Sequence, residues 1–595
     1  MPFHIDCTAS AGKKSPADLW RWLQTGLLFF LALHGLQEAF AQQARDRSII
    51  KQGYFSTFRF LHSGQYEDAR KGFEQATRRG IKAGAVRFID SICYYTMEGE
   101  VAYRQGRLAE ALGYFRSALQ LYNQHSGWML HVKFPSNIAE KQANRRLPAW
   151  AHTKRQIRLG SFPERFNFLR SGGGLVPGQV GGGGQLQPLH VDELVRCIAL
   201  AIRRYAELLG PLAKQDPLAQ QVLENLTQRQ GPPNHWSEIW LDLPLGVAYA
   251  AVGKNEMAVG TLKRSLLAGG RMDHPLTGLA MLTLGRISLE NGNYDEAIKW
   301  LQEAALSAFY YDRAEVIEEA FQLLFLAQSS SGRGGIPPTL SAATAWAKQK
   351  KYEEMYASLL AKTAEAYAVG GNLKLASSTL SLVRRAIGRS DMAKARIGAE
   401  INYVGSVIAY MQGDVKDGYQ SLQAAIEFER KGSVRLFHIK LVDSEYVRGA
   451  IRDRGAMKLY EQVLDDPVAI VWRQQPLEAL SQLLVPQPLA LNHWFYAALK
   501  REKPLVALNI VDRMKRARFY SQLPLGGRLL NLCWIMQGPL STLSQEAQLQ
   551  RREFTAQFPT FEKLVQQADN IREKLKDNPL LSEDPDLTKI QTSLL

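Results

Sequence analysis

The chain has 595 residues, with 73 lysines and arginines against 57 aspartates and glutamates, which gives a formal net charge of +16 at pH 7. Its 46% of hydrophobic and 22% of charged residues are ordinary for a folded protein and exclude a disordered or fibrous chain. One compact core does not extend to this length, so we expect several domains or a repeat array, whose units bury their apolar faces on one another.

The start of the chain, from Met1 to Ala41, has the order of an export signal. Basic residues precede an apolar run from Leu23 to Leu36, and the small-x-small sequence Ala39-Phe40-Ala41 follows. The uninterrupted apolar core is shorter than the roughly 20 residues that span a membrane. We therefore expect export, to the periplasm in a bacterium, with cleavage after Ala41. A retained membrane anchor and an amphipathic first helix of a cytoplasmic protein are the alternatives.

Residues 42–130 predict two helix–turn–helix units. Gly64 and Gly106 break the chain at turns. Ala69 and Ala111, each five positions later, are small enough for two antiparallel helices to approach closely. The interval between the two glycines equals the interval between the two alanines, so the units share one period.

Residues 131–190 interrupt this period. Between 133 and 170 nine basic residues face two acidic ones, with aromatic residues between them, and the glycine runs 172–174 and 181–184 indicate an exposed connection. Such a segment can meet anionic lipid, a protein or exposed bases, or its aromatics can pack on the rest of the fold. We expect it to project from the solenoid as a loop, at least from Ser171 to Gly184. Its candidate contact residues are Arg145, Arg146, Arg155 and Arg158.

Helical periodicity resumes at residue 191 and continues to about 535. In the clearest unit Gly285 and Ala297 allow two helices to approach, Gly292 breaks the chain between them, and Tyr294 and Leu301 fill the groove. Comparable turn glycines stand at positions 253, 371 and 413. The last two are separated by the same interval as Gly64 and Gly106, so the period recurs late in the chain.

These units resemble the tetratricopeptide repeat (TPR) family, in a variant longer than its usual period of about 34 residues. A related α-solenoid with irregular helix pairs is the alternative. The resemblance implies antiparallel helix pairs stacked into a right-handed superhelix with a concave inner face. Strand patterns are nearly absent. We therefore predict an all-α, TPR-like solenoid with a glycine-rich insert and a C-terminal helical tail at 536–595.

The stretch from Arg516 to Arg528 resembles the segment that links TPR arrays to caspase-like CHAT peptidase domains in some bacterial proteins. This resemblance does not extend into the peptidase, so it carries over no catalytic residue. It implies at most a sensor or regulatory arm of a peptidase system.

No motif in the chain is typical of catalysis. H-E-x-x-H, G-x-S-x-G and C-x-x-C are absent. Gly246 and Gly253-Lys254 depart from a phosphate loop, because six residues separate the glycines and Asn255 replaces Ser or Thr. His125 and His131 have no further ligands nearby in the sequence, and the four cysteines are far apart, which favours buried thiols. We predict a non-enzyme without cofactor or metal.

The TPR resemblance implies a scaffold that binds an extended or helical segment of a protein partner with the first helix of each repeat. In the best-matched repeats the candidate residues are Tyr54, Phe58, His62, Glu100, Tyr103, Arg104, Arg286 and Glu290. The basic charge also permits an anionic membrane surface, with the insert as a tether, and export would disfavour nucleic acid.

Overall fold

The computed structural model describes residues 48–83, 86–143, 145–170, 185–332, 335–388, 390–523 and 540–576, with a few single positions from 532 onward. The predicted export signal, the glycine-rich run 171–184 and residues 524–528 of the CHAT-like stretch lie outside them. The chain divides into two compact units, residues 1–441 and 442–595. This boundary lies inside the predicted repeat region 191–535.

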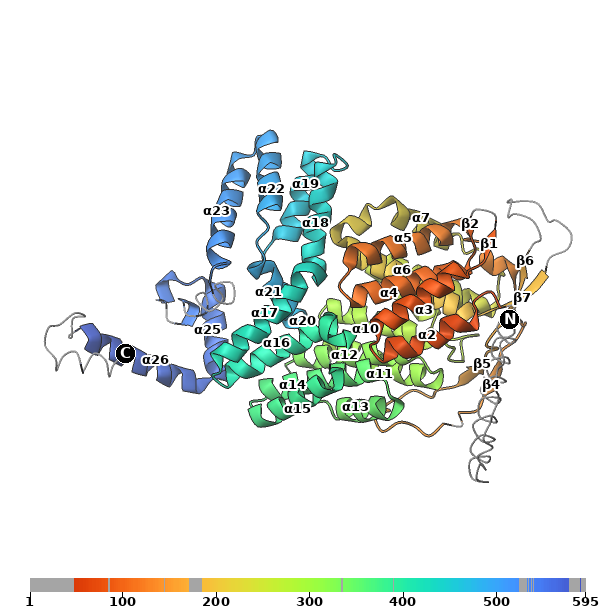
Figure 1. Cartoon of the computed structure of the whole chain (residues 1–595), viewed down its shortest axis with the longest axis horizontal. Coiled ribbons are helices and arrows are strands. Elements are labelled where there is room, and N and C mark those ends of the chain that lie inside the picture. The colour runs from red at the N-terminus through yellow and green to blue at the C-terminus, as the bar shows by residue number, and fades with distance from the viewer. Residues whose placement is uncertain are drawn as a thin grey trace, which may run out of the picture. The chain divides into compact units, whose positions relative to one another are not determined.

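Within its described residues the first unit is a series of eight first helices, each followed in the chain by a second helix (Figure 1). The first helices are α2 (Gln52–His62), α4 (Asp90–Arg104), α6 (Val191–Leu209), α8 (Ile239–Ala251), α10 (Thr277–Glu290), α12 (Ala314–Ser330), α14 (Glu353–Val369) and α16 (Arg396–Met411). The second helices are α3 (Tyr66–Arg78), α5 (Leu108–Gln124), α7 (Pro217–Thr227), α9 (Asn255–Arg264), α11 (Tyr294–Tyr310), α13 (Pro338–Lys350), α15 (Leu373–Ile387) and α17 (Val415–Gly432). The predicted all-α solenoid is confirmed.

The predicted turn and contact residues have the expected roles. Gly292 lies between α10 and α11 with φ +75°, a backbone conformation that residues with a side chain rarely adopt. A Cβ on Gly285 would lie 2.8 Å from the Leu301 side chain, so only glycine lets α10 and α11 approach this closely. Ala297 is fully buried at the same contact. Local backbone requirements therefore explain why small residues recur at fixed spacing.

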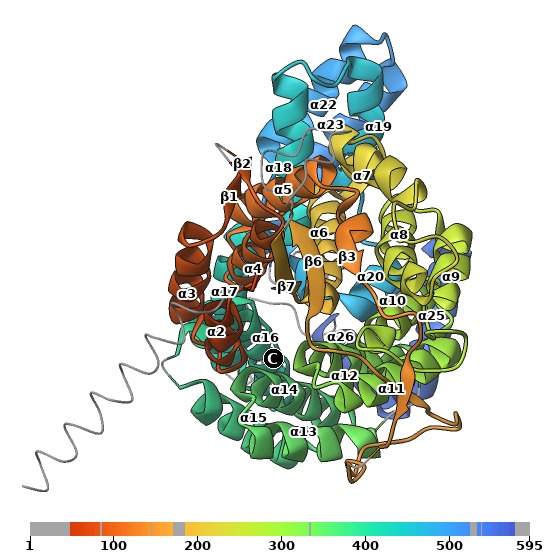
Figure 2. The same cartoon turned by 90° about the vertical axis from the view of Figure 1, so that its right-hand side faces the viewer.

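The first unit curves until its two ends meet. The backbone N–H of Glu67, at the start of α3, donates to the carboxylate of Asp391, 324 residues later, at 2.9 Å. Asp391 begins the short 3₁₀ helix η4 (Asp391–Lys394), which precedes α16. At a second contact, a Cβ on Gly106 would lie 2.7 Å from the ring of Phe428 in α17. The solenoid is therefore a closed ring, and its first helices surround a common centre in Figure 2.

The insert packs on this ring, so the prediction of a projecting loop is wrong for its described part. It contributes β3 (Val132–Lys133), β4 (Ala139–Lys141), β5 (Leu159–Ser161), β6 (Phe166–Arg170) and β7 (Gln185–Leu189). Antiparallel β3–β6–β7 forms one small sheet and β4–β5 a hairpin, while β1 (Lys82–Ala83) and β2 (Val86–Arg87) pair separately. Phe166 and Phe168 are buried in the core, and Trp150 packs between Phe309 and Phe321. Burial of these aromatics outweighs the mutual repulsion of the basic residues.

The second unit begins within α18 and consists of helices as far as it is described. They are α18 (Val434–Val447), α19 (Asp453–Leu464), α20 (Ala469–Gln474), α21 (Pro476–Leu484), α22 (Pro488–Lys500), α23 (Pro504–Tyr520), α25 (Gln545–Gln557) and α26 (Pro559–Lys576). Tyr460 and Trp494 are buried among α19, α22 and α23. Throughout the described ranges, no helix has the length and apolarity needed to span a membrane.

Candidate functional site

The first helices of all eight pairs line one cavity of about 280 Å³, which we call the chamber. Six of the eight predicted partner-binding residues lie on its wall, namely Phe58, His62, Glu100, Tyr103, Arg104 and Arg286. They gather there because residues one helical turn apart on each first helix share its inward face. Tyr54 is instead fully buried beside the chamber, and Glu290 is exposed at the end of α10.

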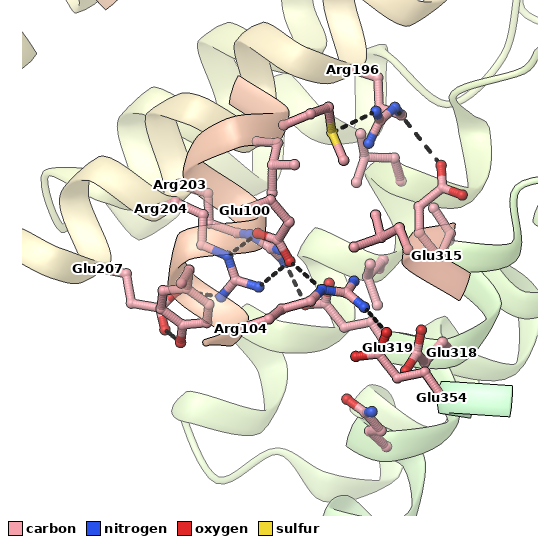
Figure 3. A pocket seen from close by; sticks show the side chains of 18 of the residues that line it. Glu100, Arg104, Arg196, Arg203, Arg204, Glu207, Glu315, Glu318, Glu319 and Glu354 are labelled. Carbon is pink, nitrogen blue, oxygen red and sulfur yellow. Dashed lines mark hydrogen bonds and ion pairs between the residues drawn. The ribbon is translucent and has the colours of Figure 1, made fainter. Parts of the chain in front are cut away.

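Arginines and glutamates from different repeats lie together on the chamber wall (Figure 3). Arg104 forms ion pairs with Glu100 at 3.1 Å and with Glu354 at 2.6 Å. Arg204 contacts Glu100 at 2.9 Å and Glu207 at 2.8 Å. One guanidinium thus joins carboxylates of two helices, so the network ties α4, α6 and α14 together.

Arginines keep partly buried carboxyl groups of the chamber wall ionised. Burial alone would raise the pKa of Glu207, but the charge of Arg204 outweighs it and lowers that pKa to about 2. Burial is likewise outweighed at Glu319, where Arg203 and Arg286 hold the pKa far below its usual range. At neutral pH these parts of the wall are fixed anion–cation pairs.

One pair of carboxyl groups behaves differently. Burial and the neighbouring Glu354 raise the pKa of Glu318 to about 8, and burial also raises the pKa of Glu354 despite its contact with Arg104. Both residues are 7% exposed. One turn further along, Gln322 of α12 donates a hydrogen bond to the hydroxyl of Ser358 in α14 at 2.8 Å. At pH 7 the raised pKa therefore favours the protonated form of Glu318.

The sequence model of the tetratricopeptide repeat matches residues 59–126 and 243–311. The chain carries tetratricopeptide repeats. The matched ranges contain the turns at Gly106, between α4 and α5, and at Gly292, between α10 and α11. The predicted TPR resemblance is therefore confirmed there. No curated protein matches the chain. TPR arrays generally act as non-enzymatic scaffolds for protein interaction, and the repeats indicate this class of function here.

Sequence reasoning missed the TPR-like helices that supply most of the charge. The charged chamber residues of α6 and α12, all outside the prediction, are Arg196, Arg203, Arg204, Glu207, Glu315, Glu318 and Glu319. The insert separates α6 from the first two TPR units, so its place in the array was hidden. The available signal was a run of charged residues three, four and seven positions apart on helices that are otherwise apolar.

A buried polar cluster lies behind the chamber and explains the position of Tyr54. Its hydroxyl donates to Glu193 Oε1 at 2.5 Å, and Arg196 donates to both oxygens of Glu193 at 2.6 and 2.8 Å. The free thiols of Cys93 and Cys197 are buried against the same cluster. Both are buried thiols, as predicted. In the described ranges no group of His, Cys, Asp and Glu side chains has the arrangement that a metal ion needs.

The arginines predicted as a basic contact surface are mostly paired within the protein. Arg145 forms a bidentate contact with Asp312 at 2.6 and 2.7 Å, and Arg155 contacts Asp273 at 2.5 Å, while Arg158 pairs with Glu140 at 2.9 Å. Arg146 is exposed. Three of the four predicted arginines are therefore engaged in ion pairs within the chain.

Proposed function

We propose that this chain is a non-enzymatic TPR scaffold that binds a protein partner by receiving part of it in the chamber. The observation that carries the proposal is the convergence of all eight first helices on one cavity with charged walls. Buried ion pairs add little net stability compared with well-packed apolar side chains, so stability alone does not account for such a wall. Fixed donors and acceptors of this kind give a binding site specificity.

The size of the chamber limits what part of a partner enters. Its volume of about 280 Å³ lies just below the roughly 300–1,000 Å³ of pockets that hold drug-sized molecules. A long side chain or a chain end fits, whereas a whole helix is too wide, at about 10 Å across. The TPR resemblance implied that a segment of the partner lies along an open concave face. Since the ring is closed, the proposed mode is instead insertion of a side chain or chain end of the partner into the chamber.

A displayed library of random peptides tests this mode with purified protein. Leu200 of α6 lines the chamber, and Leu382 of α15 is 44% exposed on the second-helix layer. We expect peptides selected on the wild type to lose binding to Leu200→Trp, which fills the chamber, and to keep binding to Leu382→Trp. Peptides that bind both variants equally would place the interaction elsewhere.

We also propose that the scaffold acts after export. The support for this is that charged, apolar and small residues follow one another in residues 1–41 as they do in an export signal. Of the two alternative functions, a membrane tether through the insert is disfavoured by the pairing of Arg145, Arg155 and Arg158. The sensor arm of a CHAT-type peptidase system rests on the sequence resemblance alone.

A further inference from the structure

Two neighbouring helices contribute matching polar positions to the chamber wall. On α12, Glu318 and Gln322 are one turn apart, and on α14, Glu354 and Ser358 have the same spacing. The Gln322–Ser358 hydrogen bond of 2.8 Å joins the two helices one turn from the carboxyl groups. Figure 3 shows Glu318 beside Glu354 at this end of the chamber. The wall therefore has a small acceptor-rich corner.

Glu318 is the member of this corner whose carboxyl group is not engaged in an ion pair with Arg104. The charged and titratable groups that act on it are Glu100, Arg104, Glu319, Glu354 and Tyr66. Arg104, the cation among them, already forms ion pairs with two of these carboxylates at 3.1 and 2.6 Å. Glu318 itself forms no ion pair or hydrogen bond with any residue in the described ranges. A carboxyl group that is 7% exposed and unpartnered, on a cavity wall, has room for a donor from outside the chain.

We propose that Glu318 and Glu354 bind an alkylammonium group that enters the chamber. This inference rests on the proposed function, because the ammonium group would belong to the inserted part of a partner. An ammonium is a compact charge with three donors, and this corner offers two carboxyl groups and the side-chain oxygens of Gln322 and Ser358. Leu279, Leu282 and Val316 line the same chamber and provide apolar contact for the alkyl stem. A lysine side chain of the partner and a free alkylamine share this chemistry.

Protonation of Glu318 gives the proposal a signature. Burial and then the neighbouring Glu354 raise the pKa of Glu318 to about 8, and a bound ammonium would favour the ionised form. Binding at pH 7 should therefore release about one proton from the protein. Since alkylammonium groups stay charged below their pKa of about 10.4, affinity should fall about tenfold for each pH unit below 8.

Calorimetric titration of the full chain with two probes tests the site. The probes are butylammonium and N-acetyl-lysine-N-methylamide, and the uncharged control is N-acetyl-norleucine-N-methylamide. We expect both charged probes to bind and to release a proton, seen as a dependence of the heat on the buffer. Tighter binding of the lysine compound assigns the site to a partner's lysine, and tighter binding of butylammonium assigns it to a free amine. Failure of both, or equal binding of the norleucine compound, overturns the proposal.

A matched pair of variants localises the binding. Glu318→Gln removes the free carboxyl group, and Glu353→Gln makes the same change at an exposed position next to Glu354. We expect Glu318→Gln to weaken both charged probes by about tenfold or more, and Glu353→Gln to leave them unchanged. Equal affinities in the two variants would overturn the assignment. If Glu318→Gln fails to fold, the wild type at pH 6.5 and 8.5 decides, because pH-independent affinity contradicts the proposal.

The outcomes also separate this inference from the proposed function. Chamber-dependent peptides without lysine or a free amino group would support the scaffold and overturn the ammonium site. Binding of butylammonium to a chain that selects no chamber-dependent peptide would support the site and refute insertion of a protein partner.

Discussion

Glu193 holds together the buried polar cluster behind the chamber, and its replacement by glutamine tests the electrostatic reasoning. Its side chain is 3% exposed, accepts a hydrogen bond from Tyr54, and forms a bidentate contact with Arg196. Glu193→Gln keeps the shape but removes the charge. Arg196, whose side chain is 5% exposed, would then keep one distant carboxylate partner, Glu315 at 3.8 Å.

The expected loss follows from the pKa of Glu193. Burial alone would raise this pKa, but the charge and hydrogen bonds of Arg196 outweigh burial and lower it from 4.5 to about 2. At about 1.4 kcal/mol for each tenfold change in an equilibrium constant, this fall corresponds to about 3 kcal/mol. Breaking a buried ion pair by removing one partner costs about 3–5 kcal/mol, which agrees in size. We therefore expect Glu193→Gln to lower the free energy of unfolding of the first unit by about 3 kcal/mol at pH 7.

Urea unfolding followed by circular dichroism measures this loss. Glu110→Gln is the control, because Glu110 pairs with Arg107 where both side chains are more than a third exposed, and such a pair contributes about 0–1 kcal/mol. The folded pKa of Glu193 is depressed, so its contribution is present above pH 4.5 and is lost as pH falls towards 2. The wild type should lose this stability in that window and Glu193→Gln should not. Equal losses in the two variants at pH 7, or identical acid profiles of wild type and Glu193→Gln, would refute the reasoning.

Three further predictions concern packing, the insert and export. Ala297→Trp should overpack the α10–α11 contact and cost about 1–3 kcal/mol or more, whereas Ser381→Trp on the exposed side of α15 should leave the melting temperature nearly unchanged. Arg155→Glu would put a carboxylate against the acidic partner Asp273 and should lower the free energy of unfolding by about 3 kcal/mol. Arg146→Glu, at an exposed position, should change it by less than about 0.5 kcal/mol. Similar unfolding midpoints for the two variants would show that the insert's arginines do not contribute to stability. Amino-terminal sequencing of the protein from its own host should begin at Gln42, and an intact terminus in the soluble cytoplasmic fraction would exclude cleavage.

The candidate site shows how far periodicity alone extends. Six of the eight residues chosen from first helices line the chamber, because the inward face of a helix follows from its sequence. Tyr54 was also predicted to face the partner, but its side chain is buried against Glu193. Nothing in a helical period tells whether an inward side chain meets a cavity or a neighbouring helix. That depends on the size and position of side chains from other repeats.

The sequence by itself determined the helix pairs, since residues such as Gly285 and Gly292 answer local requirements of backbone angle and helix approach. Only the tertiary structure decided that the array closes. The contact between Glu67 and Asp391 spans 324 residues and depends on the summed curvature of every pair between them. Closure brings carboxyl groups and guanidinium groups of distant repeats into one buried volume, where each pKa depends on neighbours far away in the chain. For that reason the free carboxyl group of Glu318, the basis of the proposed ammonium site, is invisible in the sequence.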